Sequence, residues 1–256
     1  MFSALAQGWT LTGAPTNNYW TSIGASADGT RLAAMAGSAC YTSTNSGLTW
    51  STNPFITFEN GTLLAASADG LRLVAATANS GEIDVSTNGG RAWQKSTNYA
   101  EAAWQSIASS ADGRKLILTE AGALVRASTN SGITWFRLVS MPNDGSAPEY
   151  AAMSADGNSL AISGFGYLFS TTNFGATWTT NILTTPCRQM AVSADGTKLV
   201  TAPYGGNIYT STNSGATWIQ QTNSPDLLWW SCASSADGTK LAAVSGTAGG
   251  SGAIYT

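Results

Sequence analysis

The chain has 256 residues, of which 43% are hydrophobic and 10% charged, and its formal net charge is −3. This composition excludes a disordered segment, and because no basic run is present we expect no nucleic-acid partner. No apolar stretch is long enough to cross a bilayer, so we expect no membrane span.

Histidine is absent, which removes the commonest general base and the commonest zinc ligand. Cys40, Cys187 and Cys232 stand at irregular spacing, and we interpret them as small buried hydrophobic residues. We predict no metal site and no cofactor. The first nine residues, MFSALAQGW, lack the basic and long apolar segments of a signal peptide. The abundance of serine, threonine, asparagine and glycine is typical of many secreted or cell-surface β-proteins.

Two short motifs alternate along the chain. The tetrapeptide Ser-Ala-Asp-Gly recurs six times at steps of 39 to 44 residues, with its aspartate at Asp28, Asp69, Asp112, Asp156, Asp195 and Asp237. Between the copies lies a box such as STNSGLTW, which ends at Trp50, Trp93, Trp135, Trp178 or Trp218. Both motifs predict turns, because glycine adopts positive φ readily and an Asp or Asn side chain can bond the backbone just ahead of it.

Four strands are predicted in each repeat, always in the same order. The first strand precedes the Ser-Ala-Asp-Gly turn and the second follows it, as at residues 31–34. The third is a segment such as residues 207–210, and the fourth begins at the box tryptophan. Helical periodicity is absent. Repeats of this length with four strands predict an all-β, six-bladed β-propeller that forms a single domain over residues 1–256.

The ends of the sequence predict how the ring closes. The sixth repeat reaches only its third strand at Tyr255, whereas Trp9 precedes the first Ser-Ala-Asp-Gly serine by 17 residues. The box residues Trp50, Trp93 and Trp218 precede the next such serine by the same 17 residues. We therefore expect the N-terminal segment to supply the fourth strand of the C-terminal blade. A closed ring has no free sheet edges, and we expect a monomer.

The box resembles the Asp-box, or BNR repeat, S-x-D-x-G-x-T-W, of sialidases, sortilin-type receptors and photosystem-assembly propellers. Here asparagine replaces the aspartate in every copy, at Asn45, Asn88, Asn130, Asn173 and Asn213. Asparagine can form the same turn, so the resemblance implies the propeller fold. In that family the box is a structural turn remote from the active site, so it implies no activity.

The resemblance does not extend to sialidase chemistry. Sialidases bind the substrate carboxylate with three arginines, whose planar forks match its geometry. Of the seven arginines here, only Arg126, Arg137 and Arg188 lie outside the two turn motifs and the strand starts beside them, and these three stand at different repeat positions. We therefore expect no arginine triad.

The unusual residues gather on one predicted face of the ring. The two motifs share one face, which we call the turn face. The opposite face carries the connections from second to third strand and from one repeat to the next, and we call it the loop face. Loops vary over a rigid scaffold, so function is expected there. The candidate ligand-binding residues are Tyr19, Trp20, Glu59, Glu101, Trp104, Glu149, Tyr150, Arg188, Asp226, Trp229 and Trp230.

Carboxylates among exposed aromatic rings suit a glycan or another small polar ligand. The first hypothesis is therefore a non-catalytic, lectin-like binding module. The second is a glycoside hydrolase or lyase that uses two carboxylates, since glycosidic cleavage needs no histidine. The candidate carboxylates are Glu59, Glu101, Glu149 and Asp226. The third is a structural or engineered scaffold without a small ligand.

An alternative interpretation assigns some of these residues to packing. Trp20, Trp104 and Trp229 share one repeat position, six residues before the Ser-Ala-Asp-Gly serine, as expected of residues between blades. Asp84 and Arg126 occupy the third-strand position that is aromatic elsewhere, in neighbouring repeats. We expect these two residues to form a structural ion pair.

Overall fold

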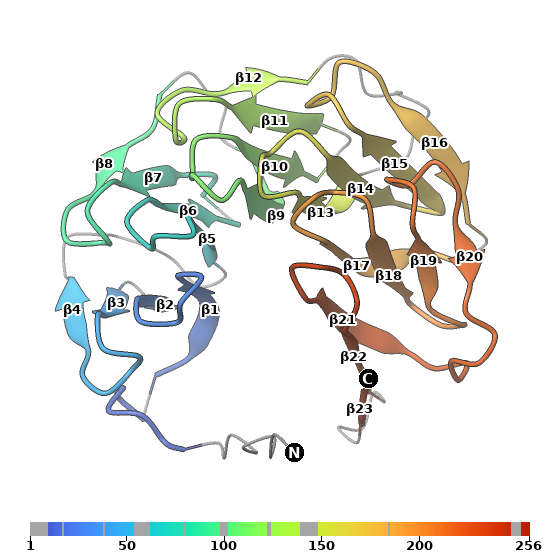
Figure 1. The fold of residues 1–256 in the computed structure, drawn as a ribbon. Helices are drawn as coiled ribbons and strands as arrows, with labels where there is room; N and C mark the ends of the chain where they lie inside the picture. The colour runs from blue at the N-terminus through green and yellow to red at the C-terminus, as the bar shows by residue number, and fades with distance from the viewer. Residues whose placement is uncertain are drawn as a thin grey trace.

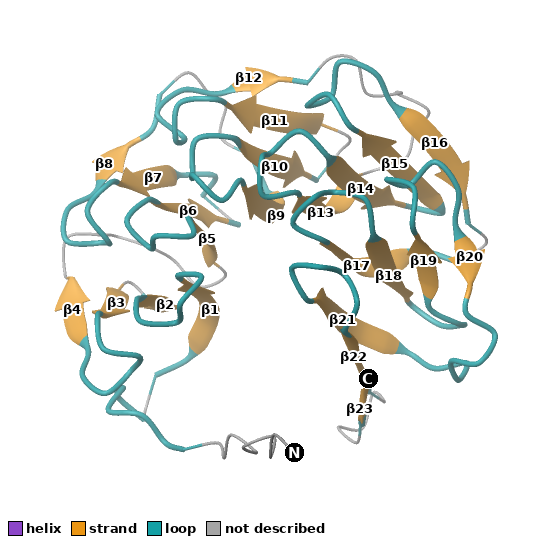
Figure 2. Ribbon diagram, viewed as in Figure 1, coloured by secondary structure: helices purple, strands orange, loops and turns teal. Residues whose placement is uncertain are grey.

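The computed structural model describes residues 10–16, 18–37, 39–53, 62–78, 80–97, 102–121, 124–138, 148–183, 185–246 and 252–256. These residues form antiparallel β-strands in six sheets and contain no helix (Figure 2). The sheets follow one another in chain order around an arc, with the first strand of each sheet on the inner side (Figure 1). The fold is a six-bladed β-propeller.

The first blade contains β1 (Trp20–Ala25), β2 (Leu32–Ala36), β3 (Ala39–Ser43) and β4 (Ser51–Asn53). The second contains β5 (Thr62–Ala66), β6 (Leu73–Thr77), β7 (Ile83–Ser86) and β8 (Gln94–Lys95). The third contains β9 (Trp104–Ser109), β10 (Leu116–Glu120), β11 (Leu124–Ser128) and β12 (Phe136–Arg137). The fourth contains β13 (Pro148–Met153), β14 (Leu160–Gly164), β15 (Tyr167–Thr171) and β16 (Thr179–Ile182). The fifth contains β17 (Cys187–Val192), β18 (Leu199–Pro203), β19 (Tyr209–Ser211) and β20 (Ile219–Gln220). In the sixth, the described residues form β21 (Trp229–Ser234), β22 (Leu241–Ser245) and β23 (Ile254–Tyr255).

The Ser-Ala-Asp-Gly turns are held by local hydrogen bonds that recur in all six blades. In the fourth blade, Ser154 Oγ donates to Asp156 Oδ1 at 2.6 Å and accepts the Ser159 N–H at 3.0 Å. Asp156 Oδ1 also accepts the Asn158 N–H at 2.9 Å. The Ser154 hydroxyl and the Asn158 N–H lower the pKa of Asp156 because they bond to its ionised form. Each turn is therefore specified by residues within five positions of one another.

In the box turns, the asparagine side chain both accepts and donates hydrogen bonds. Asn130 Oδ1 accepts a bond from Ser128 Oγ at 2.9 Å and the Thr134 N–H at 3.0 Å. Its amide nitrogen donates to Thr134 Oγ1 at 2.8 Å, a bond that an aspartate carboxylate cannot donate. Trp135 Nε1 donates to Gly132 O at 3.0 Å, which folds the indole back over the turn.

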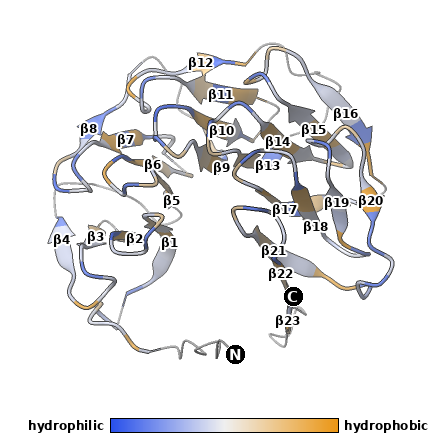
Figure 3. Ribbon diagram, in the orientation of Figure 1, coloured by the Kyte–Doolittle hydropathy of each residue, from blue (hydrophilic) through white to orange (hydrophobic). Residues whose placement is uncertain are grey.

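Hydrophobic layers lie between successive blades. The hydropathy colours show the apolar residues concentrated on middle strands such as β7 and β18, whereas the outer strand β8 is hydrophilic (Figure 3). Each of the first four layers also contains the box tryptophan of the later blade. These tryptophans are Trp93, Trp135, Trp178 and Trp218. The layer between the fifth and sixth blades has no box tryptophan among the described residues.

A chain of backbone hydrogen bonds also joins the blades. The alanine N–H of each Ser-Ala-Asp-Gly turn donates to the alanine carbonyl of the next turn at 2.7 to 2.9 Å. The bonded pairs are Ala27–Ala68, Ala68–Ala111, Ala111–Ala155, Ala155–Ala194 and Ala194–Ala236. At the two ends of this series of bonds, the Ala27 carbonyl accepts no such bond and the Ala236 N–H donates none.

The first and sixth blades each have one face that no described blade covers. Ile23 in β1 is 66% exposed, whereas Leu64 at the same position of the second blade is 8% exposed. Val244 in β22 is exposed, but its counterparts Met35 and Ala202 are fully buried. The predicted closing strand begins at Trp9, which lies outside the described residues. Thr10, Leu11 and Thr12, which would continue it, are described and form no strand, so the closure stays a prediction.

Candidate functional site

One position in the inner strands carries a β-bulge. The register shifts by one residue in β1, β9, β13, β17 and β21, always five residues before the Ser-Ala-Asp-Gly serine. The bulged residues are Thr21, Gln105, Glu149, Arg188 and Trp230. A bulge interrupts the alternation of side chains and can aim one of them away from the packed layers. It therefore presents one residue from each of these blades at the loop-face end of the inner strands.

Three predicted site residues occupy this bulge in consecutive blades. Glu149 belongs to β13, Arg188 to β17 and Trp230 to β21. The inner strands β13, β17 and β21 contact one another in that order. The tertiary structure thus places a carboxylate, a guanidinium and an indole side by side on the loop face.

Arg188 is the centre of this group, because two aromatic rings lie against its guanidinium. Its Cζ lies 4.2 Å from the Trp230 ring centroid and 4.3 Å from the Tyr204 ring centroid. Cation–π contacts of this kind hold a long side chain in one orientation. Tyr204 and Trp230 are 46% and 45% exposed, so much of each ring is open to solvent. We call Glu149, Tyr150, Arg188, Tyr204 and Trp230 the Arg188 cluster.

The backbone fixes the two rings. The Tyr204 N–H donates to Pro186 O at 2.7 Å, and Tyr204 forms an antiparallel bridge with Leu228, which directly precedes β21. Trp230 lies against Gly246, where a Cβ atom would come within 2.6 Å of the indole nitrogen. A larger residue at position 246 would displace the indole from Arg188.

No described residue forms an ion pair with the charged groups of the Arg188 cluster. Among the described residues, no hydrogen bond or ion pair engages the Arg188 guanidinium, although Glu149 lies close enough to feel its charge. Burial raises the pKa of Glu149, and the positive charge of Arg188 partly offsets this rise. Arg188 therefore keeps its N–H donors available for an external group.

The two tryptophans Trp104 and Trp229 lie elsewhere, fully buried between blades. Trp104 Nε1 donates to Gly81 O at 2.9 Å, and Trp229 Nε1 donates to Gly206 O at 2.9 Å. Each indole thus fastens the connection between the second and third strands of the preceding blade. Their rings are not open to a ligand, in line with the packing interpretation.

The first blade holds a separate aromatic group. Trp20 packs edge-on against Tyr41 with ring centroids 5.1 Å apart and lies tilted against Trp50 at 6.4 Å. Tyr19 is almost fully exposed. In the described residues, no aromatic contact joins this group to the Arg188 cluster.

The remaining predicted carboxylates do not join the cluster in the described chain. Asp226 Oδ1 accepts the Gly206 N–H at 2.8 Å, so this carboxylate braces the loop after β18. Glu59 and Glu101 lie outside the described residues. In the part of the chain that the structure describes, no group of three or more Cys, Asp or Glu residues could hold a metal ion. No helix among these residues is long and apolar enough to cross a membrane.

Tyr204 was missed at the level of sequence. It stands eleven residues after the Ser-Ala-Asp-Gly serine, where the other repeats have Gly37, Ala78, Ala121, Phe165 and Gly246. Only the fourth and fifth repeats carry an aromatic residue at this position, and a position-by-position comparison of the loops contains that signal.

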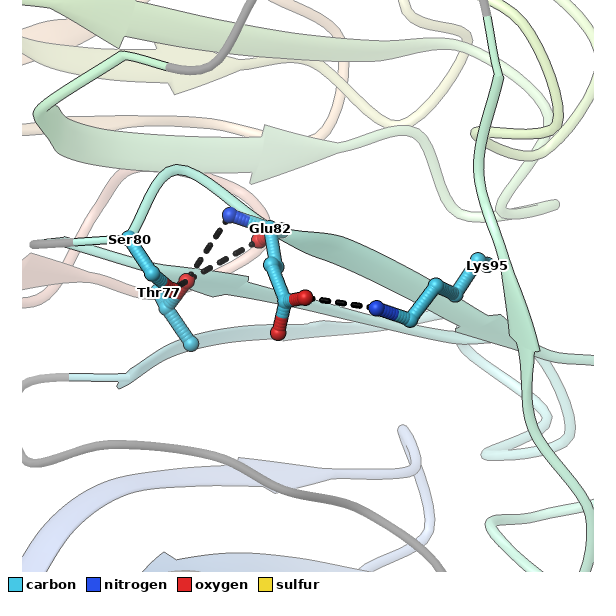
Figure 4. A network of polar contacts seen from close by, with 4 residues as sticks. All are labelled: Thr77, Ser80, Glu82 and Lys95. Carbon is cyan, nitrogen blue, oxygen red and sulfur yellow. Dashed lines mark hydrogen bonds and ion pairs between the residues drawn. The ribbon is translucent and has the colours of Figure 1, made fainter.

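A polar network in the second blade corrects one expectation. Lys95 Nζ donates to Glu82 Oε1 at 2.5 Å, while the Glu82 N–H donates to Thr77 Oγ1 at 2.9 Å (Figure 4). The predicted ion pair between Asp84 and Arg126 is wrong. Strand register places Lys95, from the same blade, opposite Asp84.

Arg126 likewise finds its partner within its own blade. Its Nε lies 3.6 Å from Glu120 Oε2, at the end of the neighbouring strand β10. Neighbouring strands of one sheet thus supply the charge partners of Asp84 and Arg126, because they lie closer than the next blade.

Comparison with known proteins supports the fold alone. No protein-family model matches the chain, and no curated protein matches it. Among solved structures, the GH74 enzyme of Niastella koreensis is similar with a TM-score of 0.71 at 17% identity over 89% of this chain. The chain spans 44% of that enzyme. YCF48 from Cyanidioschyzon merolae is similar with a TM-score of 0.68 at 16% identity, over 90% of this chain and 80% of that one. A YCF48 structure bound to a D1 peptide has a TM-score of 0.68 at 15% identity, over 92% and 77% of the two chains.

Proposed function

We propose that this protein is a non-catalytic, ligand-binding propeller that recognises carbohydrate on its loop face, at the Arg188 cluster. The observation that carries the proposal is the contact of the Arg188 guanidinium with two half-exposed aromatic rings. Small-ligand sites combine apolar and aromatic surface with a few fixed polar groups, and this corner of the propeller has both. The exposed parts of Tyr204 and Trp230 can stack on sugar C–H faces, while Arg188 and Glu149 bond hydroxyl groups.

Titration calorimetry with ligands selected on a glycan array tests this proposal. Trp230→Ala and Tyr204→Ala should each weaken binding about tenfold or more, as expected when an aromatic anchor is removed. The control is Phe136→Ala, because Phe136 has the same exposed fraction as Tyr204 but lies on outer strand β12. If no glycan on the array is bound, the proposal is wrong. The remaining hypothesis is then a structural scaffold without a sugar ligand.

A second candidate function is glycoside hydrolysis. Burial raises the pKa of Glu149, as a general acid requires, and GH74 enzymes are among the similar structures. Cleavage also needs a second carboxylate about 5 to 9.5 Å away. One neighbour is a GH74 xyloglucanase, so release of reducing ends from xyloglucan is the assay. Hydrolysis that Glu149→Gln abolishes would favour this function over simple binding.

We further propose that the N-terminal segment, with Trp9 at the box position, completes the sixth blade, so that the ring closes as a single-domain monomer. Three features support this closure. The Ala27 carbonyl and the Ala236 N–H are the unused ends of the hydrogen-bond chain between blades. The uncovered sides of the first and sixth blades carry apolar residues that are buried in other blades. A cavity of about 440 Å³ lies where the box tryptophan of the sixth blade is missing, and Val200, Ile208 and Tyr255 line it.

A further inference from the structure

The Arg188 cluster has a feature that narrows its ligand class. Both rings lie against the guanidinium, with their centroids 4.2 and 4.3 Å from its Cζ, and its N–H donors point outward from the edge of the guanidinium plane. No described residue accepts a hydrogen bond from that edge. A planar donor fork that is already oriented and unpaired matches a planar carboxylate, which accepts two parallel bonds from it.

The surroundings favour a carboxylate that is carried on a sugar ring. Tyr204 and Trp230 each use one ring face on Arg188 and leave close to half of their surface exposed. A pyranose ring can stack beside the guanidinium on this surface while its carboxylate meets the arginine edge. We propose that the cluster selects acidic sugars, of the uronic-acid class, over neutral sugars. This inference rests on the proposed carbohydrate function.

The nearby acidic residues define the approach of such a ligand. Glu149 occupies the same bulge position one blade before Arg188, but it does not lie within ion-pair distance of the guanidinium. When ionised, it repels an acidic ligand. Asp226 is bonded to the Gly206 N–H and belongs to the loop that precedes Trp230. Glu149 therefore opposes the binding of an acidic ligand beside β13, the strand that packs against the strand of Arg188.

This charge arrangement predicts opposite effects for two substitutions. Arg188→Gln should weaken binding of an acidic sugar about tenfold or more, since it removes charge-assisted hydrogen bonds to the carboxylate. Glu149→Gln should tighten the same binding, because it removes a repelling charge. Arg188→Lys keeps the charge but loses the fork, so most of the loss should persist.

The experiment compares oligogalacturonate as the free acid with the same oligomer as its methyl ester. The two probes share every sugar ring and differ only at the carboxyl group, which is charged in the acid and a neutral methyl ester in the other probe. Calorimetry should show tighter binding of the free acid, and Arg188→Gln should abolish this preference by weakening binding of the free acid more than binding of the ester. If Arg188→Gln weakened both probes equally, the arginine would act only by holding the rings, and the inference would be overturned.

Two further outcomes separate the inference from the proposed function. Equal binding of acid and ester overturns selection for acidic sugars but leaves carbohydrate recognition intact. Absence of binding by both probes and by all neutral glycans overturns both. A peptide with a free C-terminal carboxylate, measured beside its amide, forms the third arm. Preferential binding of that peptide would reject a sugar as the carrier of the carboxylate.

Discussion

Replacing Trp9 with alanine tests the proposed closure of the ring. In the four preceding layers, the box tryptophan of the later blade packs between two blades, and the layer between the fifth and sixth blades lacks one. The cavity there is lined by Val200, Ile208, Trp229 and Leu241. If Trp9 fills this cavity, its truncation removes contacts with both blades.

The magnitude follows from the equivalent tryptophans. A buried tryptophan that is cut to alanine costs about 3–5 kcal/mol of unfolding free energy, because burial is lost and a cavity remains. Trp135 is buried, whereas Trp93, Trp178 and Trp218 are half-buried, so the lower end of that range applies. We expect a loss of about 3 kcal/mol in urea denaturation. Leu11→Ala is the control, because Leu11 lies close by in sequence and is exposed.

Thiol labelling of the three cysteines shows which layer between blades Trp9→Ala destabilises. Cys40 lies between the first and second blades, Cys187 between the fourth and fifth, and Cys232 between the fifth and sixth. Burial raises the pKa of Cys40 and Cys232 to about 12 and that of Cys187 to about 11, so all three react slowly in the native state. Trp9→Ala should accelerate thiol labelling of Cys232 alone, as read by peptide mass spectrometry. If Trp9→Ala matched Leu11→Ala in stability and left Cys232 protected, Trp9 would not occupy this layer.

Three further predictions concern stability. Burial raises the pKa of Asp84 from its ordinary value of 3.8 to about 6. The stabilising contribution of the neutral carboxyl is therefore fully present below pH 3.8 and is lost as the pH rises through 6. Asp84→Asn should therefore raise the melting temperature more at pH 7.5 than at pH 5. Asp156→Asn is the control: the pKa of Asp156 is lowered below its ordinary value of 3.8, so the effect of this substitution should be the same at pH 5 and pH 7.5. Ser154→Ala should cost about 1–3 kcal/mol in urea denaturation, since it leaves the Ser159 N–H without its acceptor, whereas exposed Ser231→Ala should change little. Gly132 has φ +81°, and a Cβ there would lie 2.8 Å from Val85 Cγ1. Gly132→Ala should therefore cost about 2–4 kcal/mol, against about 1 kcal/mol for Gly37→Ala, which has positive φ but open space; equal losses would refute the clash.

Sequence reasoning predicted the repeats, the turns and the six blades because their determinants are local. The hydrogen bonds of the Ser154–Asp156 turn and of the Asn130 box turn each join residues no more than five positions apart. Such contacts form wherever the motif occurs, so a periodic motif predicts a periodic structure. The partners of Asp84 and Arg126 were predicted wrongly because the prediction did not use strand register.

The site was only partly predictable from the sequence. Two adjacent candidate residues show why. Trp229 and Trp230 are adjacent in sequence, yet Trp229 is buried between blades and Trp230 contacts Arg188 on the loop face. A bulge between these positions breaks the alternation that would otherwise assign each side chain to a face. Tyr204 reaches the cluster through its pairing with Leu228, a contact between two loops.

The sequence by itself therefore determined which segments turn, which form strands and how often the unit repeats. The tertiary structure decided which residues meet, because the bulges and the loop pairing depend on hydrogen bonds between strands and blades. Glu149, Arg188 and Trp230 are about 40 residues apart along the chain. Only the side-by-side packing of β13, β17 and β21 makes them neighbours.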